Sequence, residues 1–339
     1  MSARECVIPV FVPHLGCRHE CVFCNQRRIS GSEKAATAAT VKQAIEQSAA
    51  LPRSGAKRQL AFYGGSFTAI EPERQEELLG AAAEAIGKGE IDAIRLSTRP
   101  DAIDETVLAR LKRFGVETVE LGAQSMDGEV LRLSGRGHTA EDVVRSSEAV
   151  KAAGFRLILQ MMTGLPGDSA EKDIETAKKL IALRPDAVRI YPTVIVRDTA
   201  LYDLWRAGEY REHTVEDAVA VCAQLMPLFE EANIPVIRLG LNPTEELSQG
   251  AAVAGAYHPA LGELVRSRIL LEKARALLAG TEPGSRVTLG VNAAELSQMI
   301  GQKRQNVRAL SRALALGELR IRSCEAERGE IVLLSIEKR

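Results

Sequence analysis

The sequence predicts an α/β protein: a partial or full (β/α) barrel over residues 1–245, followed by a small α+β domain over residues 246–339. Two observations support this prediction. Short apolar segments alternate with helical stretches at least six times, and the alternation ends near residue 245. Such alternation indicates parallel βαβ units, and six or more in succession favour a barrel over an open doubly wound sheet. In barrels of this kind, the chemistry takes place at the carboxyl ends of the strands.

The expected strands are short apolar segments bounded by polar or glycine-containing turns. They lie at residues 8–12, 59–63, 94–97, 118–121, 157–162, 187–191 and 236–239. Helical periodicity is found between them, at residues 72–86, 105–114, 139–153, 170–183 and 215–232. Gly115 and Gly154 follow two of these helices, where glycine is a common stop signal.

The pattern changes in the last third of the chain. Residues 249–257 are rich in glycine and alanine and are predicted to form a linker. A helix at 261–279, a strand at 286–291, a long helix at 293–316 and strands at 319–322 and 330–336 follow. From residue 260 onward there are 14 Lys and Arg against 9 Asp and Glu, although the whole chain has a net charge of −1. This basic segment is consistent with a polyanionic partner, and equally with an uneven surface charge that has no function.

The composition is that of a soluble globular protein, with 45% hydrophobic and 26% charged residues. No apolar run reaches the length of a membrane span, so no membrane partner is expected. The first residues, MSAREC, lack a signal-peptide pattern, and we therefore expect a cytoplasmic protein. A disulfide framework is not expected in such a chain.

Three of the six cysteines, Cys17, Cys21 and Cys24, crowd into eight residues with the spacing C-x3-C-x2-C. Thiolates at this spacing can converge on three corners of a cubane cluster. A [4Fe–4S] cluster normally takes four cysteines, so three local ligands leave one iron open to a small molecule. Zinc is the alternative. A structural zinc site needs a fourth ligand; His14 and His19 are near, but no second CxxC or HxxxH motif follows.

The spacing of these cysteines, with Phe23 before the last one, resembles the signature of the radical S-adenosylmethionine (SAM) superfamily. The resemblance continues through five further segments, at residues 62–68, 97–101, 120–125, 136–139 and 161–167. Two families share this set: the oxygen-independent coproporphyrinogen oxidases and the radical SAM part of the Elongator catalytic subunit. Residues 189–210 are more similar to the second family. The gap between Cys17 and Cys21 has the short length seen in the porphyrin enzymes, and Ser97 stands where glutamate is usual.

The resemblance implies a barrel of the radical SAM type with a [4Fe–4S] cluster and SAM as cofactors. Cys17, Cys21 and Cys24 would bind the cluster, and an external one-electron reductant of the flavodoxin or ferredoxin type would supply the electron. SAM cleavage would then give a 5′-deoxyadenosyl radical that abstracts a hydrogen atom from the substrate. The residues expected to contact the cofactor are Phe23, Gly64, Gly65, Ser66, Thr98, Gln124, Arg136 and Gln160.

Among these residues, Gly64 and Gly65 would meet the methionine amino group, and Gln124 and Arg136 would face the carboxylate and ribose of SAM. The plain alternatives are a tight turn at the glycines and a surface salt bridge at Arg136. On the substrate side we expect Tyr191, Arg238 and His258. The first two end predicted strands, and a structural role is the alternative for all three residues.

The segment 300–306, IGQKRQN, resembles the G-x-x-[GR] turn of RNA-binding KH-type domains, in which the loop clamps phosphates. An ordinary amphipathic helix with solvated Lys and Arg is the alternative. Three functions remain open at this point. The first is a radical SAM enzyme that modifies RNA, such as a tRNA uridine. The second is a radical SAM enzyme that acts on a porphyrin or another small molecule. The third is a non-catalytic iron–sulfur or haem-handling protein of the same fold.

Overall fold

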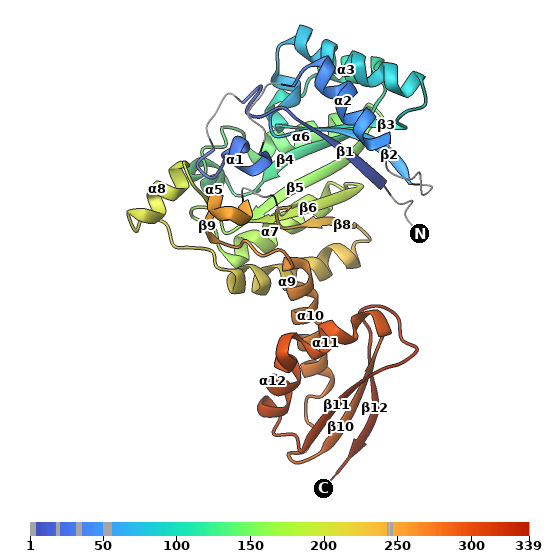
Figure 1. Cartoon of the computed structure of the whole chain (residues 1–339). Coiled ribbons are helices and arrows are strands. Elements are labelled where there is room, and N and C mark those ends of the chain that lie inside the picture. The colour runs from blue at the N-terminus through green and yellow to red at the C-terminus, as the bar shows by residue number, and fades with distance from the viewer. Residues whose placement is uncertain are drawn as a thin grey trace. The chain divides into compact units, whose positions relative to one another are not determined.

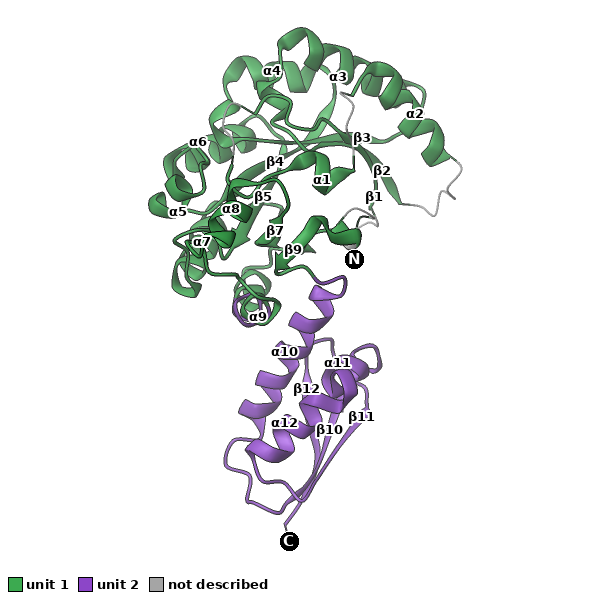
Figure 2. Ribbon diagram, turned by 60° about the vertical axis from the view of Figure 1, so that its left-hand side comes forward, with its two compact units in different colours: residues 1–218, 225–257 green, residues 219–224, 258–339 purple. Residues whose placement is uncertain are grey.

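A computed structural model describes residues 5–17, 21–31, 36–49, 56–242, 244 and 247–338 of the chain. The chain divides into two compact units (Figure 2). The first comprises Met1–Ala218 and Leu225–Tyr257, and the second Val219–Gln224 and His258–Arg339. Residues 245 and 246, where the sequence placed the domain boundary, lie outside the described residues.

The first unit is built on a seven-stranded parallel sheet with the order β1-β2-β3-β4-β5-β6-β8 (Figure 1). The strands are β1 (Glu5–Phe11), β2 (Lys57–Tyr63), β3 (Ala93–Thr98), β4 (Val116–Gln124), β5 (Arg156–Thr163), β6 (Ala187–Pro192) and β8 (Val236–Leu239). Each predicted strand is present, and the sheet forms a partial barrel, which confirms the predicted fold class. The central strands are buried along most of their length, as expected when helices cover a parallel sheet.

Helices connect these strands along the outer side of the sheet (Figure 2). They are α2 (Ala38–Ala49), α3 (Pro72–Gly87), α4 (Glu105–Arg113), α6 (Ala140–Ala152), α7 (Ala170–Ala182) and α9 (Val215–Glu231). Capping boxes begin two of them: Thr139 with Asp142 at α6, and Thr214 with Asp217 at α9. Such boxes satisfy two otherwise unpaired backbone N–H groups and so define where the helix starts. Three short helices, α1 (Gln26–Ser30), α5 (Gly128–Leu133) and α8 (Ala200–Arg206), lie in the connecting segments.

The predicted linker at residues 249–257 is wrong. A π-helical turn at Leu247–Ala251 leads into strand β9 (Ala252–Gly255), which pairs antiparallel with β7 (Val194–Val196). The small residues serve close packing here, because a Cβ on Gly255 would lie 2.8 Å from the carbonyl oxygen of Thr193. The glycine here therefore marks a close approach of two backbone segments rather than a linker.

The second unit is α+β. It contains α10 (Leu261–Leu277), β10 (Arg286–Val291), α11 (Leu296–Ile300), α12 (Gln305–Ala313), β11 (Glu318–Ser323) and β12 (Ile331–Glu337). In its sheet, β10 is central, parallel to β11 and antiparallel to β12. The single helix predicted over 293–316 is wrong, because the chain turns sharply between α11 and α12. Gly301, Lys303 and Arg304 have φ angles of 75°, 48° and 61°, which a helix cannot accommodate.

No helix among the described residues combines the length and the apolar character that crossing a bilayer would require.

Candidate cofactor site at the carboxyl edge of the sheet

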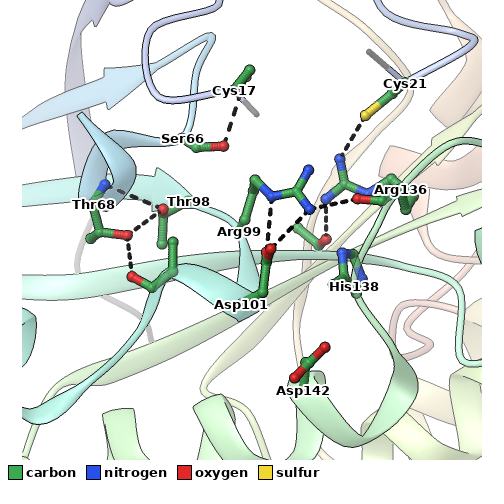
Figure 3. Close-up of polar contacts among 12 residues, drawn as sticks. Cys17, Cys21, Ser66, Thr68, Thr98, Arg99, Asp101, Arg136, His138 and Asp142 are labelled. Atoms are coloured by element: carbon green, nitrogen blue, oxygen red, sulfur yellow. Dashed lines mark hydrogen bonds and ion pairs between the residues drawn. The ribbon is translucent and has the colours of Figure 1, made fainter. Parts of the chain in front are cut away.

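The loop that carries Cys17 is fastened to the loop that follows β2. The backbone N–H of His14 donates to the carbonyl oxygen of Gly64 at 2.9 Å, and that of Ser66 donates to Leu15 at 2.9 Å. The Sγ atom of Cys17 lies 3.7 Å from the hydroxyl of Ser66 (Figure 3), and Cys17 is otherwise exposed. The two loops therefore form one ledge at the carboxyl edge of β1 and β2.

Glycine is required where these loops touch. A Cβ on Gly65 would lie 2.4 Å from the carbonyl oxygen of Val12 and 2.5 Å from that of Leu15. A Cβ on Gly16, which has φ +72°, would lie 2.2 Å from the carbonyl oxygen of Ser66. All three contacts are shorter than real Cβ contacts, so any side chain would force the loops apart. Gly65 and Gly16 thus position the cysteine loop, whatever else it binds.

The second part of the cysteine motif is held by different elements. Within it, the N–H of Cys24 donates to the carbonyl oxygen of Cys21 at 3.0 Å, so these two residues share one turn. The N–H of Val22 donates to Ser134 at the end of α5 at 3.1 Å, and its carbonyl accepts from Leu201 in α8 at 2.7 Å. The turn is therefore anchored on both sides.

Two side chains donate hydrogen bonds to cysteine sulfurs. Gln26 Nε2 lies 3.2 Å from the Sγ of Cys24, and Arg136 Nη1 lies 3.1 Å from the Sγ of Cys21 (Figure 3). The half-buried Cys24 has a thiol pKa that burial, and then the nearby Cys21, raise to about 12. A thiol of this kind ionises when a metal coordinates it, and both donors suit a thiolate acceptor.

Arg136 is the centre of a buried polar network at the ends of β3 and β4. Its Nη2 donates to the carbonyl oxygen of Gly122 at 2.7 Å. Its own carbonyl accepts from Arg99 Nη2 at 2.6 Å, and Arg99 is held in turn by a two-point ion pair with Asp101 at 2.9 and 3.1 Å (Figure 3). The Nε of Arg136 is buried and has no hydrogen-bond partner among the described residues. Arg136 is therefore not the surface salt bridge considered as its alternative.

Gln124 ends β4 in an unusual backbone conformation. Its φ is +65°, and the register between β4 and β5 shifts between Gly122 and Gln124. Positive φ is uncommon for a residue with a side chain and is found preferentially at functional sites. The Oε1 of Gln124 accepts from Gln160 Nε2 at 3.2 Å, so two of the expected cofactor residues lie together on neighbouring strands.

Thr98 and Phe23 have contacts of their own. The hydroxyls of Thr98 and Thr68 are 2.6 Å apart, and that of Thr68 also donates to the carbonyl oxygen of Ala102 at 2.6 Å. Thr98 is buried, and its hydroxyl fastens the loops after β2 and β3 to each other. Phe23 packs with Tyr191 against a small apolar cluster beneath the site.

His138 lies beside this network on the loop after α5. Its Nε2 is 3.1 Å from the carbonyl oxygen of Ala123, and its Nδ1 is buried without a hydrogen-bond partner among the described residues. Burial, followed by the positive charge of Arg136, lowers the pKa of His138 to about 4. The ring is therefore neutral near pH 7, and Nε2 carries the proton that it donates to Ala123.

A second polar cluster joins side chains of β2, β4 and β6, and of its members only Tyr191 was expected from the sequence. The Arg189 side chain on β6 forms an ion pair with Glu120 on β4, with Nε and Oε2 3.0 Å apart. It also donates to the hydroxyls of Tyr63 at 2.7 Å and Tyr191 at 3.1 Å. Burial alone would lower the pKa of Arg189. Glu120 and the two tyrosines outweigh burial, so the pKa lies above its ordinary value. Burial also raises the pKa of Tyr63, to about 12.

The structure places the three substrate-side candidates differently. Tyr191 belongs to the Arg189 cluster, and Arg238 pairs in register with Arg189 across β6 and β8. Arg238 donates a short hydrogen bond to Asn242. His258 belongs to the second unit, where its Nδ1 accepts from the N–H of Ala260 at 3.1 Å.

The donor set fits an iron–sulfur cluster by its chemistry. Three cysteines stand on two anchored turns, two of their sulfurs accept hydrogen bonds, and a buried guanidinium nitrogen beside them is unpartnered within the described part of the chain. No group of three His, Cys, Asp or Glu side chains among the described residues is arranged to hold a metal ion. His19, considered as a zinc ligand, lies outside the described residues. The fit therefore rests on the donors and their hydrogen bonds rather than on a preformed coordination sphere.

Comparison with known proteins identifies the class. Residues 11–180 match the radical SAM superfamily, and residues 185–270 match the radical SAM C-terminal domain. The first match covers half of the chain, so the chain belongs to the radical SAM superfamily and is an enzyme of that class. Membership implies SAM and a [4Fe–4S] cluster as cofactors. The resemblance inferred from the cysteine motif is thereby confirmed.

Within the superfamily, the chain is similar to Elongator-type proteins. It is 30% identical to a tRNA uridine(34) acetyltransferase of Methanocaldococcus infernus, over 52% of this chain and 37% of that protein. It is 28% identical to Elongator complex protein 3 of Homo sapiens, over 66% of this chain and 44% of that protein. The match thus spans less than half the length of these relatives. The solved structure of M. infernus Elp3 lacking residues 1–46 has the same fold, with a TM-score of 0.64 and 24% identity, over 81% of this chain and 64% of that one.

Proposed function

We propose that the first unit binds a [4Fe–4S] cluster through Cys17, Cys21 and Cys24, binds SAM beside it, and acts on a tRNA uridine. The observation that carries this proposal is the position of Arg136, which joins Cys21 to the carbonyl at the end of β4. That contact links the cysteine turn to the strand ends where barrels of this kind do their chemistry. When both cofactors are bound, one-electron cleavage of SAM supplies a 5′-deoxyadenosyl radical.

The cysteine turns and the loops that follow β2, β3 and β4 are called the rim here, and its residues would have separate tasks. Arg136 and Gln26 stabilise the thiolates of Cys21 and Cys24 by donating to their sulfurs. Gly64 and Gly65 keep the backbone after β2 open to the methionine part of SAM, together with Ser66. Gln124 and Gln160 offer amide groups to its polar ends.

Thr98 keeps the adjoining loops in place, and Phe23 packs against the apolar side chains of Val130, Met162 and Leu165.

The Arg189 cluster would form the substrate side of the site. Glu120, Tyr63 and Tyr191 fix the guanidinium of Arg189, so its charge is in place before a substrate arrives. Tyr191 and Arg238 are the residues of this side that we propose to contact the substrate. A preset positive charge and phenolic hydroxyls suit a polar base with carbonyl acceptors such as uracil. His258 belongs to the second unit, and its role toward the substrate stays a prediction.

Support for tRNA as the substrate comes from two directions. The relatives that match over half to two thirds of this chain include proteins named for tRNA uridine and for Elongator. The last eighty residues are basic, which suits an RNA partner. The reaction also needs an external one-electron donor of the flavodoxin or ferredoxin type, and a cytoplasmic location would bring the chain together with tRNA.

The test uses the full chain, reconstituted anaerobically with iron and sulfide. Reduced with dithionite and mixed with SAM, it should form 5′-deoxyadenosine, and unmodified tRNA transcript should increase the yield and gain a modified uridine. Coproporphyrinogen III replaces the tRNA in a parallel reaction. Stimulation by the porphyrin alone would overturn the tRNA assignment, and absence of 5′-deoxyadenosine under all conditions would overturn the enzymatic proposal. The Cys24→Ala variant is the matched control for cluster-dependent product.

A further inference from the structure

We propose that a groove in the second unit, between α11–α12 and the edge strand β11, binds single-stranded RNA through its phosphate backbone. The inference rests on the proposed function, because it names the surface through which an RNA substrate would be held. It concerns only the second unit, and its test is separate from that of SAM cleavage.

Half of the residues that line the groove are apolar, and these are called its apolar floor here; the other half are arginines. It is lined by Ile300, Arg304, Val307, Arg320, Ile321 and Arg322, and its volume is about 200 Å³. This is below the roughly 300–1,000 Å³ typical of pockets that enclose a small molecule. A hollow of this size beside an open strand edge suits part of a long ligand. The apolar floor can take an unstacked base, and the arginines can take the phosphates on either side.

The turn between α11 and α12 forms one end of the groove and is rigidly held. Asn306 Nδ2 donates to the backbone carbonyls of Ser267 at 3.2 Å and Gln298 at 3.2 Å, and it lies 2.9 Å from the hydroxyl of Ser267. Asn306 is buried. A Cβ on Gly301 would lie 2.9–3.1 Å from Gln305 and Asn306, so the turn needs glycine there. The two following cations, Lys303 and Arg304, are therefore presented from a fixed backbone rather than a mobile loop.

The charge of this surface is unbalanced. Residues 300–322 contain six Lys and Arg and one carboxylate, that of Glu318. Glu318 pairs with Arg320 at 2.7 Å on the surface, where such pairs contribute little. Arg304 and Arg322 form no ion pair with any described residue. Two guanidinium groups in one groove that form no ion pair with a described residue favour a ligand with repeated negative charge.

The chemistry favours a single strand over other polyanions. The chain has no Phe, Tyr or Trp after Tyr257, so bases cannot stack on an aromatic platform as they do in many single-strand binders. Arginine planes and phosphate contacts remain, which predicts strong salt dependence and little sequence preference. Duplex RNA keeps its bases stacked inside the helix and could not use the apolar floor. An acidic peptide could occupy the arginines but has no flat group for the hollow.

The experiment measures fluorescence anisotropy of a labelled twelve-nucleotide oligouridylate with the full chain, at several salt concentrations. In the Arg304→Glu/Arg322→Glu variant we expect affinity to fall at least about 10-fold. The slope of log affinity against log salt should fall by about 1 to 1.5, because each single-strand phosphate contact contributes about 0.7. The matched control is Arg286→Glu/Arg328→Glu, which makes the same charge change outside the groove and should keep most of the affinity.

Several results would overturn the inference. They are no binding by the unaltered chain at 50 mM salt, equal loss in the control variant, equal affinity for duplex RNA, and equal competition by polyglutamate, which would assign the groove to an acidic protein. If the glutamate variant does not fold, as judged by circular dichroism, Arg304→Gln/Arg322→Gln replaces it. Formation of 5′-deoxyadenosine without RNA is measured in every variant and should not change. Its absence in the unaltered chain would count against the proposed function and not against the groove.

Discussion

The cysteine rim and the Arg189 cluster lie on the same sheet but are built in different ways. At the rim, neighbouring loops meet through backbone groups and through the side chain of Arg136, and close contacts at Gly16 and Gly65 fix the geometry. In the Arg189 cluster, long charged and phenolic side chains from β2, β4 and β6 meet across the sheet. A rim of this kind can be shared by many enzymes that bind the same cofactor. A cluster of long side chains can be changed strand by strand, which suits the substrate side.

The largest expected effect is the loss of the cluster, which depends on the rim and not on the Arg189 cluster. Replacing Cys24 by alanine removes a proposed cluster ligand, so iron content and 5′-deoxyadenosine should both fall to background while the fold persists. Cys6→Ala is the matched control, because Cys6 lies on β1 outside the motif and should leave both unchanged. Iron content, the yield of 5′-deoxyadenosine and circular dichroism are the measurements. If Cys24→Ala keeps its iron and still forms 5′-deoxyadenosine, the proposed role of the rim is wrong.

A large loss of stability is expected in the Arg189 cluster. Glu120→Ala leaves the buried Arg189 cation without its carboxylate, which should lower the free energy of unfolding by about 3–5 kcal/mol. The double variant Glu120→Leu/Arg189→Met removes both charges and should recover most of this loss. Urea denaturation of the single and double variants measures it. A single variant as stable as the unaltered chain would show that the pair does not organise the inner face.

The same double variant sharpens the comparison between the regions. Because Glu120 and Arg189 are proposed to serve the substrate, uncoupled formation of 5′-deoxyadenosine should persist, while substrate modification should be lost. Equal loss of both reactions would mean that the two regions are not separable.

His138 tests whether the rim is dry and positively charged. Its pKa is lowered to about 4 in the folded chain, and the unfolded value is about 6.5, so the unfolded state binds the proton more tightly. Stability from this group is therefore full above about pH 7.5 and falls as pH drops from 6.5 toward 4, by about 2 kcal/mol at pH 5. His138→Gln should remove this part of the pH dependence of unfolding, measured at pH 7.5 and pH 5. An unchanged pH profile in the variant would contradict the assigned environment.

The smallest effect concerns the donor to Cys21. Arg136→Met removes the hydrogen bond to Sγ and keeps an unbranched side chain of moderate length. Partners that bond to metal ligands typically change metal affinity by about 10–100-fold, so the variant should lose its iron faster to a chelator by a factor in that range. Arg99→Met is a useful comparison, since Arg99 touches the carbonyl of Arg136 but no cysteine sulfur. Equal rates for Arg136→Met and the unaltered chain would show that the bond to Cys21 is unimportant.

Regular periodicity made much of the fold predictable. The strands Val236–Leu239 and Arg286–Val291 begin and end at the predicted residues, because apolar runs between turn residues mark them clearly. The helix predicted over 293–316 failed because its apolar periodicity continues past the break at Gly301, where contacts with Asn306 impose the turn. That glycine was the available signal.

The site was predictable only where its chemistry is local. The three cysteines and the glycines after β2 stand in short segments, so their spacing carries the information. Glu120 and Arg189 are sixty-nine positions apart, and only the register of β4, β5 and β6 brings them together. The signal in the sequence was a charged residue within two otherwise apolar predicted strands, Glu120 in β4 and Arg189 in β6. Burying such a charge requires a partner.

The central claim is that three thiolates at the rim hold a cluster with one iron open to SAM. Electron paramagnetic resonance of the anaerobically reconstituted, dithionite-reduced full chain tests it directly, together with iron and sulfide analysis. The account predicts about four iron and four sulfide per chain and a reduced-cluster signal that changes when SAM is added. A chain that takes up zinc but no iron and sulfide, or a cluster signal that SAM leaves unchanged, would contradict it.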